Sequence, residues 1–145
     1  MKIKLLIALF CLGALFLFSL GCFQVMAPSG GVTEATAKNT WRSSSPFAMV
    51  DWVKNGSSLT VVLKNNTYET INFVSINIGS AVNADFDANI ASGDQRTKVI
   101  TDLEPCAVGT RFSLPKETIK ITYSTEPMSV NRTQMALADI VGTCS

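Results

Sequence analysis

The sequence predicts an α+β layout, in which a long N-terminal apolar α-helix precedes an all-β, antiparallel, immunoglobulin-like sandwich. Three observations predict it. No charged residue occurs between Leu5 and Thr33, short apolar runs alternate with polar residues after Phe47, and turn residues separate those runs. A chain of 145 residues has room for one compact domain. We therefore expect a hydrophobic helix at 1–27, a linker or stalk at 28–46 and the sandwich at 47–145.

The first expected element is the apolar helix. Leu5–Ala27 would form a helix of roughly 35 Å at 1.5 Å per residue, close to the ~30 Å hydrocarbon core of a bilayer. Its apolar residues favour no single face, so apolar material must surround it on all sides. A membrane anchor or the core of a helical filament would provide that. The residues expected to pack along this helix are Leu5, Leu9, Leu12, Leu15, Phe16, Leu20 and Phe23.

Two other readings of the N-terminus stay open. One is a cleaved secretory signal, with Lys2 and Lys4 as its basic start. The other is a lipoprotein signal, because Ser19-Leu20-Gly21-Cys22 resembles a lipobox with Cys22 as the acylated residue. In a retained helix, the two lysines would keep the N-terminus on the cytoplasmic side and the rest of the chain outside.

After a small, polar stretch from Pro28 to Pro46, the chain contains the expected strands of the sandwich. Between Thr70 and Gly79 the apolar alternation changes phase, so a β-bulge near Phe73-Val74 would keep both sets of apolar residues facing the core. A short helical stretch is expected at Gln134–Ala138. The other strands are expected at Phe47–Val53, Leu59–Lys64, Ala84–Ile90, Lys98–Leu103, Thr118–Tyr123 and Asp139–Thr143, with turns at Asn55-Gly56, Ser92-Gly93-Asp94 and Glu126-Pro127.

Two further features suit a domain outside the cytoplasm. Cys106 and Cys144 form an even pair, which in an oxidising compartment favours a disulfide that ties the last strand to an earlier loop. Three acceptor patterns make Asn55, Asn65 and Asn131 candidates for N-glycosylation.

The composition points away from catalysis and from nucleic acid. The chain has no histidine, which removes the usual general base and the commonest metal ligand. Its 12 basic and 11 acidic residues leave no basic excess for a phosphate backbone. We expect no enzyme, no cofactor, no metal and no nucleic-acid partner. Asp85, Asp87, Asp94 and Asp102 could supply oxygen ligands for calcium, but their spacing fits no EF-hand loop.

Four stretches stand out in the C-terminal two-thirds of the chain: Pro46–Gly79, Cys106-Ala107-Val108-Gly109, Lys120–Tyr123 and the ending Val141-Gly142-Thr143-Cys144. In their order and residue types, they resemble the globular domain of archaeal type IV pilins. The N-terminus departs from the family, because only Met-Lys-Ile-Lys precedes the apolar run and no acidic residue occurs before Glu34.

The resemblance implies a structural subunit of an extracellular filament, built from identical copies that wait in the membrane before they assemble. The alternative is a membrane- or lipid-anchored monomeric surface domain that binds or adheres. Either function would place the protein at the cell surface, with glycans as possible decoration.

Overall fold

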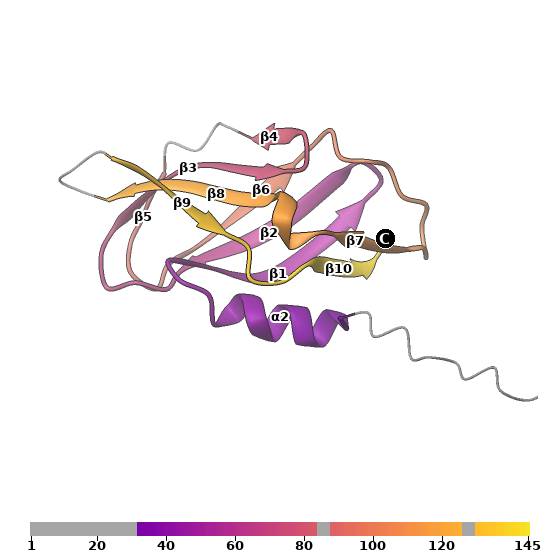
Figure 1. Ribbon diagram of the computed structural model, residues 1–145, viewed down its shortest axis with the longest axis horizontal. Helices are drawn as coiled ribbons and strands as arrows, with labels where there is room; N and C mark the ends of the chain where they lie inside the picture. Colours follow the sequence, from indigo (N-terminus) through magenta and orange to yellow (C-terminus); the bar gives the residue numbers. More distant parts are fainter. Residues whose placement is uncertain (1–31, 84–87, 126–129) are drawn as a thin grey trace, which may run out of the picture. The chain divides into compact units, whose positions relative to one another are not determined.

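The strands form two antiparallel sheets and a short ribbon (Figure 1). This computed structural model describes residues 32–83, 88–125 and 130–145. The β1 sheet has the order β1 (Phe47–Asn55), β2 (Ser58–Asn65) and β6 (Gln95–Ile100). The β3 sheet contains β4 (Ala81–Asn83), β3 (Ile71–Ile78), β8 (Ile119–Thr125) and β9 (Asn131–Met135), with β5 (Ala88–Ile90) also paired to β3. The end ribbon joins β7 (Arg111–Leu114) to β10 (Ile140–Thr143), and a 3₁₀ turn, Lys116–Thr118, leads into β8.

The two sheets enclose one core, because alternate residues of their strands point inward. In β2, Leu59, Val61 and Leu63 are buried while the residues between them are partly exposed. In β3, the pairing with β8 shifts register between Phe73 and Ser75. The shift keeps residues of both parities inside, since Phe73 and Ile76 are both fully buried. The predicted β-bulge is therefore confirmed.

Phe47 joins the two sheets at the centre of this core. Its ring meets the ring of Phe73 edge-on, with centroids 5.4 Å apart, and that of Tyr123 at 5.9 Å. Phe73 and Tyr123 are direct cross-strand partners in the β3 sheet. Edge-to-face aromatic pairs add about 0.5–1.5 kcal/mol beyond the area that they bury. This cluster therefore fixes how the first strand of one sheet lies over the middle of the other.

A two-residue turn connects β1 to β2 at the predicted position. Asn55 pairs with Ser58, and Gly56 between them has a φ of +54°. Tight hairpins need a left-handed residue at this place, and glycine adopts it without steric cost. The turn also anchors a neighbouring loop, because Leu103 N–H donates to Ser57 O and Cys106 N–H donates to Gly56 O.

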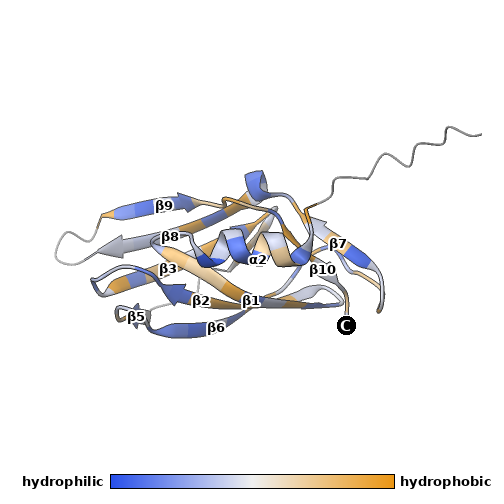
Figure 2. Cartoon of the chain, turned by 90° about the horizontal axis from the view of Figure 1, so that it is seen from below, coloured by the Kyte–Doolittle hydropathy of each residue, from blue (hydrophilic) through white to orange (hydrophobic). Residues whose placement is uncertain are grey.

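The helix α2 (Glu34–Arg42) packs against β1 and β10 (Figure 2). Thr33 caps its first turn, where the hydroxyl oxygen accepts a hydrogen bond from Thr36 N–H. A helix of nine residues is marginal in isolation. It is stabilised here by Ala37 and Trp41, which lie one turn apart and are fully buried in the core.

The edge of β1 that faces away from β2 is closed by other parts of the chain. The side-chain amide of Gln134 both accepts from Phe47 N–H and donates to Phe47 O, each at 2.8 Å. Arg42 donates from Nε to Val50 O, and Ser145 N–H donates to Lys54 O at 3.0 Å. Side chains and the C-terminus thus occupy backbone groups that another strand would otherwise pair with.

The fold class predicted from the sequence is wrong as a whole. The described residues are mostly strand, and their one α-helix is the short α2 rather than a long apolar one. Among these residues, no helix combines the length and the hydropathy needed to cross a bilayer. The predicted helix and its packing residues Leu5 to Phe23 lie outside the described part of the chain. The prediction rested on hydropathy alone, which shows that a segment needs apolar surroundings but does not fix its conformation. An all-β sandwich, with α2 at one edge, remains a good description of residues 32–145.

Several local expectations also change. Within the stretch 28–46, where a linker is expected, α2 forms over Glu34–Arg42, and Val32–Ser145 is one compact unit. The short helix expected at Gln134–Ala138 is absent from the structure, because β9 runs through Gln134 and pairs with β8. The strands β4, β7 and β9 are not predicted from the sequence, because each is only three to five residues long. The turn at Glu126-Pro127 lies largely outside the described residues.

Candidate functional site

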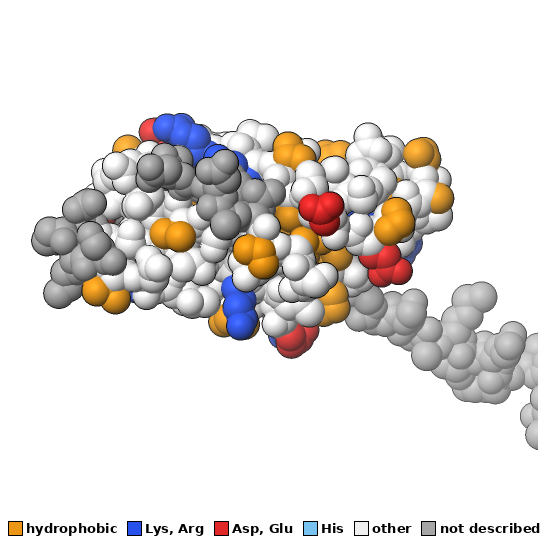
Figure 3. All heavy atoms as spheres, turned by 90° about the horizontal axis from the view of Figure 1, so that it is seen from above, with side chains coloured by type: hydrophobic (Ala, Val, Ile, Leu, Met, Phe, Trp, Pro, Cys, Tyr) orange, Lys and Arg blue, Asp and Glu red, His pale blue; other side chains and the backbone are white. Residues whose placement is uncertain are grey.

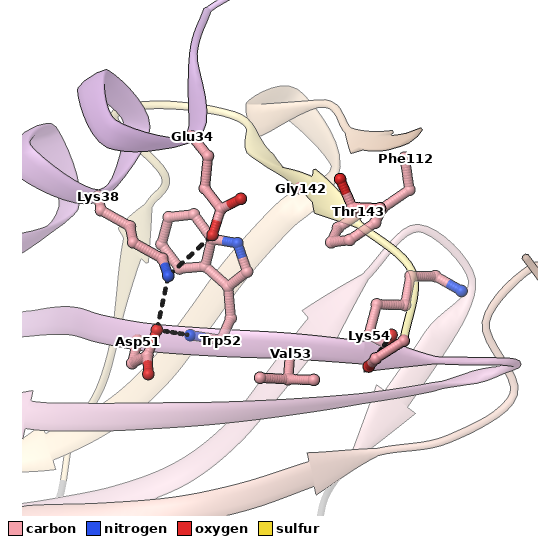
Figure 4. Close-up of a pocket in the computed structure, with 10 residues that line it drawn as sticks. Glu34, Lys38, Asp51, Trp52, Val53, Lys54, Phe112, Gly142 and Thr143 are labelled. Carbon is pink, nitrogen blue, oxygen red and sulfur yellow. Dashed lines mark hydrogen bonds and ion pairs between the residues drawn. The ribbon is translucent and has the colours of Figure 1, made fainter. Parts of the chain in front are cut away.

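A hollow beside charged side chains lies at the end of the domain that holds the C-terminus (Figure 4). Its volume is about 290 Å³. Four elements line this α2 hollow, because α2, β1, β7 and β10 converge there. The lining residues are Glu34, Lys38, Asp51, Trp52, Val53, Lys54, Phe112, Gly142, Thr143 and Ser145.

Lys38 is the charged centre of the hollow. Its Nζ lies 2.8 Å from Glu34 Oε1, one helical turn away, and 2.7 Å from Asp51 Oδ1 on β1. The same ammonium lies 5.3 Å from the centre of the Trp52 ring, within the range of a cation–π contact. Asp51 Oδ1 also accepts from Trp52 N–H at 2.9 Å. Lys38 therefore links α2 to the edge of the β1 sheet.

These contacts hold both charges in place. The hydrogen bond from Lys38 lowers the pKa of Asp51, and the bonds from Lys38 to Asp51 and then Glu34 raise the pKa of Lys38. Asp51 is thus ionised and Lys38 protonated across the physiological range. The pair is suited to holding a fixed local field and to hydrogen bonding, not to moving a proton at neutral pH.

The floor of the hollow depends on a glycine. A Cβ on Gly142 would lie 3.1 Å from Phe112 Cε1 and 3.4 Å from Glu34 Oε2. The missing side chain lets the Phe112 ring lie against the β10 backbone, with the Glu34 carboxylate beside it. The hollow therefore combines an aromatic ring, a carboxylate oxygen and the Lys38 ammonium within one small recess.

Lys54 lies next to the hollow and is buried. Its Nζ donates to Gly56 O at 2.5 Å and to Glu104 O at 2.6 Å, and it lies 3.4 Å from Cys106 Sγ. Burial lowers its pKa, while the nearby charge of Glu104 acts in the opposite direction. Its burial could have been anticipated from the parity of β1, because Lys54 lies on the same side of the strand as Trp52.

The predicted disulfide is present. Cys106 and Cys144 are bonded, with their Cα atoms 6.2 Å apart and 38 residues between them in sequence. Cys144 N–H donates to Thr110 O, and Gly109 N–H donates to Cys144 O. The bridge therefore ties the end of the chain to the loop before β7.

The three candidate glycan acceptors differ in their surroundings. Asn55 and Asn131 are exposed, at the end of β1 and the start of β9. Asn65 is fully buried, and its Nδ2, where a glycan would attach, donates to Glu69 O and to Ile90 O. Asn65 therefore has a structural role in the folded domain.

Tyr68 is the surface residue that sequence reasoning missed. It lies in the loop between β2 and β3, and its side chain is fully exposed. Other exposed hydrophobic side chains are scattered among polar atoms on the face that Figure 3 shows. The only signal in the sequence was one aromatic residue inside the polar run Lys64–Thr70.

Other predicted positions carry no site in the part of the chain that is described. Asp94 and Asp102 join no cluster of three or more potential metal ligands there. Asp85 and Asp87 lie outside the described residues, as do Lys2, Lys4 and Cys22.

No protein-family model, curated protein or solved structure matches the chain.

Proposed function

We propose that the chain is a non-enzymatic structural subunit of an extracellular filament, with residues 32–145 as the domain that faces outward. The disulfide is the observation that carries the proposal. A bridge of this kind persists in oxidising compartments and is rare in the cytosol. Together with Lys54, it fastens the C-terminus to the β1–β2 turn and to the loop before β7.

The apolar segment supports assembly from identical copies. Leu5–Ala27 has no charged residue, and exposing one large apolar side chain costs about 1.5–3 kcal/mol. A bilayer would cover the segment before assembly, and neighbouring copies would cover it in a filament. Two of the 12 basic residues, Lys2 and Lys4, precede the apolar segment, so the domain has 10 basic and 11 acidic residues. This near balance limits repulsion between stacked domains.

The geometry of the α2 hollow supports a non-catalytic role. Its lysine and the carboxylate of Asp51 satisfy each other, and no cofactor is needed to explain their arrangement. A surface of this kind is suited to recognition by hydrogen bonds and aromatic contact.

A second candidate is a single-copy surface domain, anchored by the membrane or by lipid, that binds or adheres. One observation favours it: the edge of β1 that faces away from β2 is already covered by Gln134, Arg42 and Ser145 of the same chain. No strand from a neighbour is needed to complete that edge.

Immunogold electron microscopy of surface material from cells that make the full chain separates the two. We expect labelled filaments from the wild-type chain. The substitution Leu15→Lys should remove them, since it places a charge in the apolar segment. Val130→Lys, at an exposed position beside β9, is the matched control and should leave filament yield unchanged. Single labelled particles from the wild-type chain would instead support the anchored monomer.

A further inference from the structure

Tyr68 is displayed at the tip of the β2–β3 loop. Its side chain is as exposed as it would be in an open peptide. A tyrosine offers a partner both an apolar ring and a hydroxyl that can donate a hydrogen bond. Tyrosine is enriched among the residues that contribute most to binding at protein interfaces.

The loop below Tyr68 is held in one shape by hydrogen bonds. Asn65 Oδ1 accepts from Thr67 N–H at 2.9 Å and from the Thr67 hydroxyl at 2.8 Å, while Asn65 Nδ2 donates to Glu69 O at 2.7 Å. The Ser92 hydroxyl donates to Thr67 O at 2.6 Å. Because the loop is already ordered, binding through Tyr68 would freeze few backbone torsions.

The β2–β3 loop lies beside the start of β1, whereas the α2 hollow is lined by the second half of that strand, Asp51–Lys54. At the start of β1, Asn66 N–H donates to Pro46 O, which fixes the loop there. At its end, Lys54 lines the hollow. The four to seven residue steps from Phe47 to these lining residues span about 13–23 Å at ~3.3 Å per residue. The Tyr68 loop and the hollow are therefore separate surfaces of the domain.

The hollow offers what a phenol side chain requires. Phe112 provides an aromatic surface, and Lys38 provides a cation beside the recess. Glu34 Oε1 is paired with Lys38, whereas Oε2 lies on the side of Phe112 and Gly142. A phenolic hydroxyl can donate to such a carboxylate oxygen in a charge-assisted hydrogen bond.

We infer that Tyr68 of one copy inserts into the α2 hollow of the next copy, so that the domains join head to tail. The inference rests on the proposed filament and names one of its contacts. The two surfaces differ, so the contact is heterologous. A heterologous contact whose rotation does not close a ring generates an open filament.

Cross-linking on cells that make the full chain tests the pairing. In a variant with both Glu69→Cys, next to Tyr68 in the loop, and Val53→Cys, an exposed residue that lines the hollow, a short membrane-impermeant bis-maleimide should give a ladder of covalent multimers. Either single substitution alone should give none. Linkage between two copies of the Glu69→Cys chain would indicate a two-fold contact and would overturn the inference.

Substitution of the tyrosine gives the second measurement. Tyr68→Ala should raise the concentration at which filaments form by about 10- to 30-fold, the usual effect of losing an aromatic anchor. Leu137→Ala, at another exposed apolar residue, is the control and should change it less than twofold. Tyr68→Phe should raise this concentration by less than Tyr68→Ala does, because the ring remains and only the hydrogen bond to Glu34 is lost.

The outcomes separate the inference from the function on which it rests. If the wild-type chain forms filaments, but the ladder is absent and Tyr68→Ala assembles normally, the inference is wrong and the filament stands. If the wild-type chain forms no multimers at all, both fail.

Discussion

The side-chain amide of Gln134 pairs with both backbone groups of Phe47, with one bond accepted and one donated at 2.8 Å each. Gln134 belongs to β9 and Phe47 to β1, so the amide takes the place of a strand residue between the two sheets. Both partners are buried. This contact closes the edge of β1. It also fixes the distance between the two sheets at Phe47, whose ring packs against Phe73 and Tyr123 in the core.

Gln134→Ala should therefore destabilise the domain. The substitution leaves the N–H and C=O of Phe47 buried without partners, at a cost of about 1–3 kcal/mol. Thr133→Ala, at the exposed neighbouring position of β9, should change the free energy of unfolding by less than about 0.5 kcal/mol. Urea unfolding with the disulfide intact measures both. Equal effects of the two variants would show that the amide contact is not stabilising.

Lys54 should make stability rise at alkaline pH. Its pKa is lowered in the folded state, so between that value and the unfolded value of 10.5 the unfolded chain binds more protons. The free energy of unfolding therefore rises with pH in this window. Lys54→Met should remove this rise, whereas Lys64→Met on the outer side of β2 should keep it. Unfolding at pH 7 to 11 compares the three chains, and an unchanged slope in Lys54→Met would contradict the assignment.

The ion pair between Lys38 and Asp51 should matter on the acid side. The hydrogen bond from Lys38 lowers the pKa of Asp51 in the folded chain. The ionised carboxylate therefore stabilises the fold fully above pH 3.8, the pKa in the unfolded chain, and this contribution is lost as the pH falls through the lower pKa of the folded chain. Because the carboxylate is partly exposed, we expect only about 0.2–1 kcal/mol from the pair. Asp51→Asn should lose this amount at pH 7 and little at pH 2. The control is Asp94→Asn, and the pair has no role if both variants respond alike.

Removing the disulfide should cost about 2–5 kcal/mol. The double variant Cys106→Ala/Cys144→Ala tests this without adding a reductant. Thermal unfolding monitored by circular dichroism should show a lower midpoint with the same native strand signal at 10 °C. An unchanged midpoint would show that the bridge does not stabilise the fold.

If the chain is glycosylated, the glycans should be on Asn55 or Asn131. Intact mass before and after deglycosylation should change in the wild-type chain and lose a step in Asn55→Gln or Asn131→Gln. Asn65→Gln should not alter the number of glycans but should destabilise the β2–β3 loop, because it disrupts the hydrogen bonds of the buried amide. A glycan mapped to Asn65 of the folded protein would contradict this geometry.

Two kinds of feature can be predicted from the sequence: those that follow from the alternation of apolar and polar residues along a strand, and those that follow from the number of residues of one type, such as cysteine. The bulge at Phe73 followed from the change in apolar phase, and the bridge between Cys106 and Cys144 followed from their even number. Helix α2 was missed because only Ala37 and Trp41 make its buried face, within a segment that otherwise reads as linker.

The candidate site was largely hidden from sequence. The α2 hollow exists because Glu34, Asp51, Phe112 and Gly142 converge from four elements, and no spacing along the chain relates them. The loop that carries Tyr68 is held by hydrogen bonds of the Asn65 side chain to Thr67 and Glu69 in the loop and to Ile90 of β5. Asn65 was read as a glycan acceptor, since a three-residue motif does not tell whether its asparagine is buried.

Cryo-electron microscopy of surface filaments from cells that make the wild-type chain tests the central claim most directly. The account predicts a helical array of this chain, with the ring density of Tyr68 from one copy in the α2 hollow of the next. Isolated copies at the surface, with no filament that contains the chain, would contradict it.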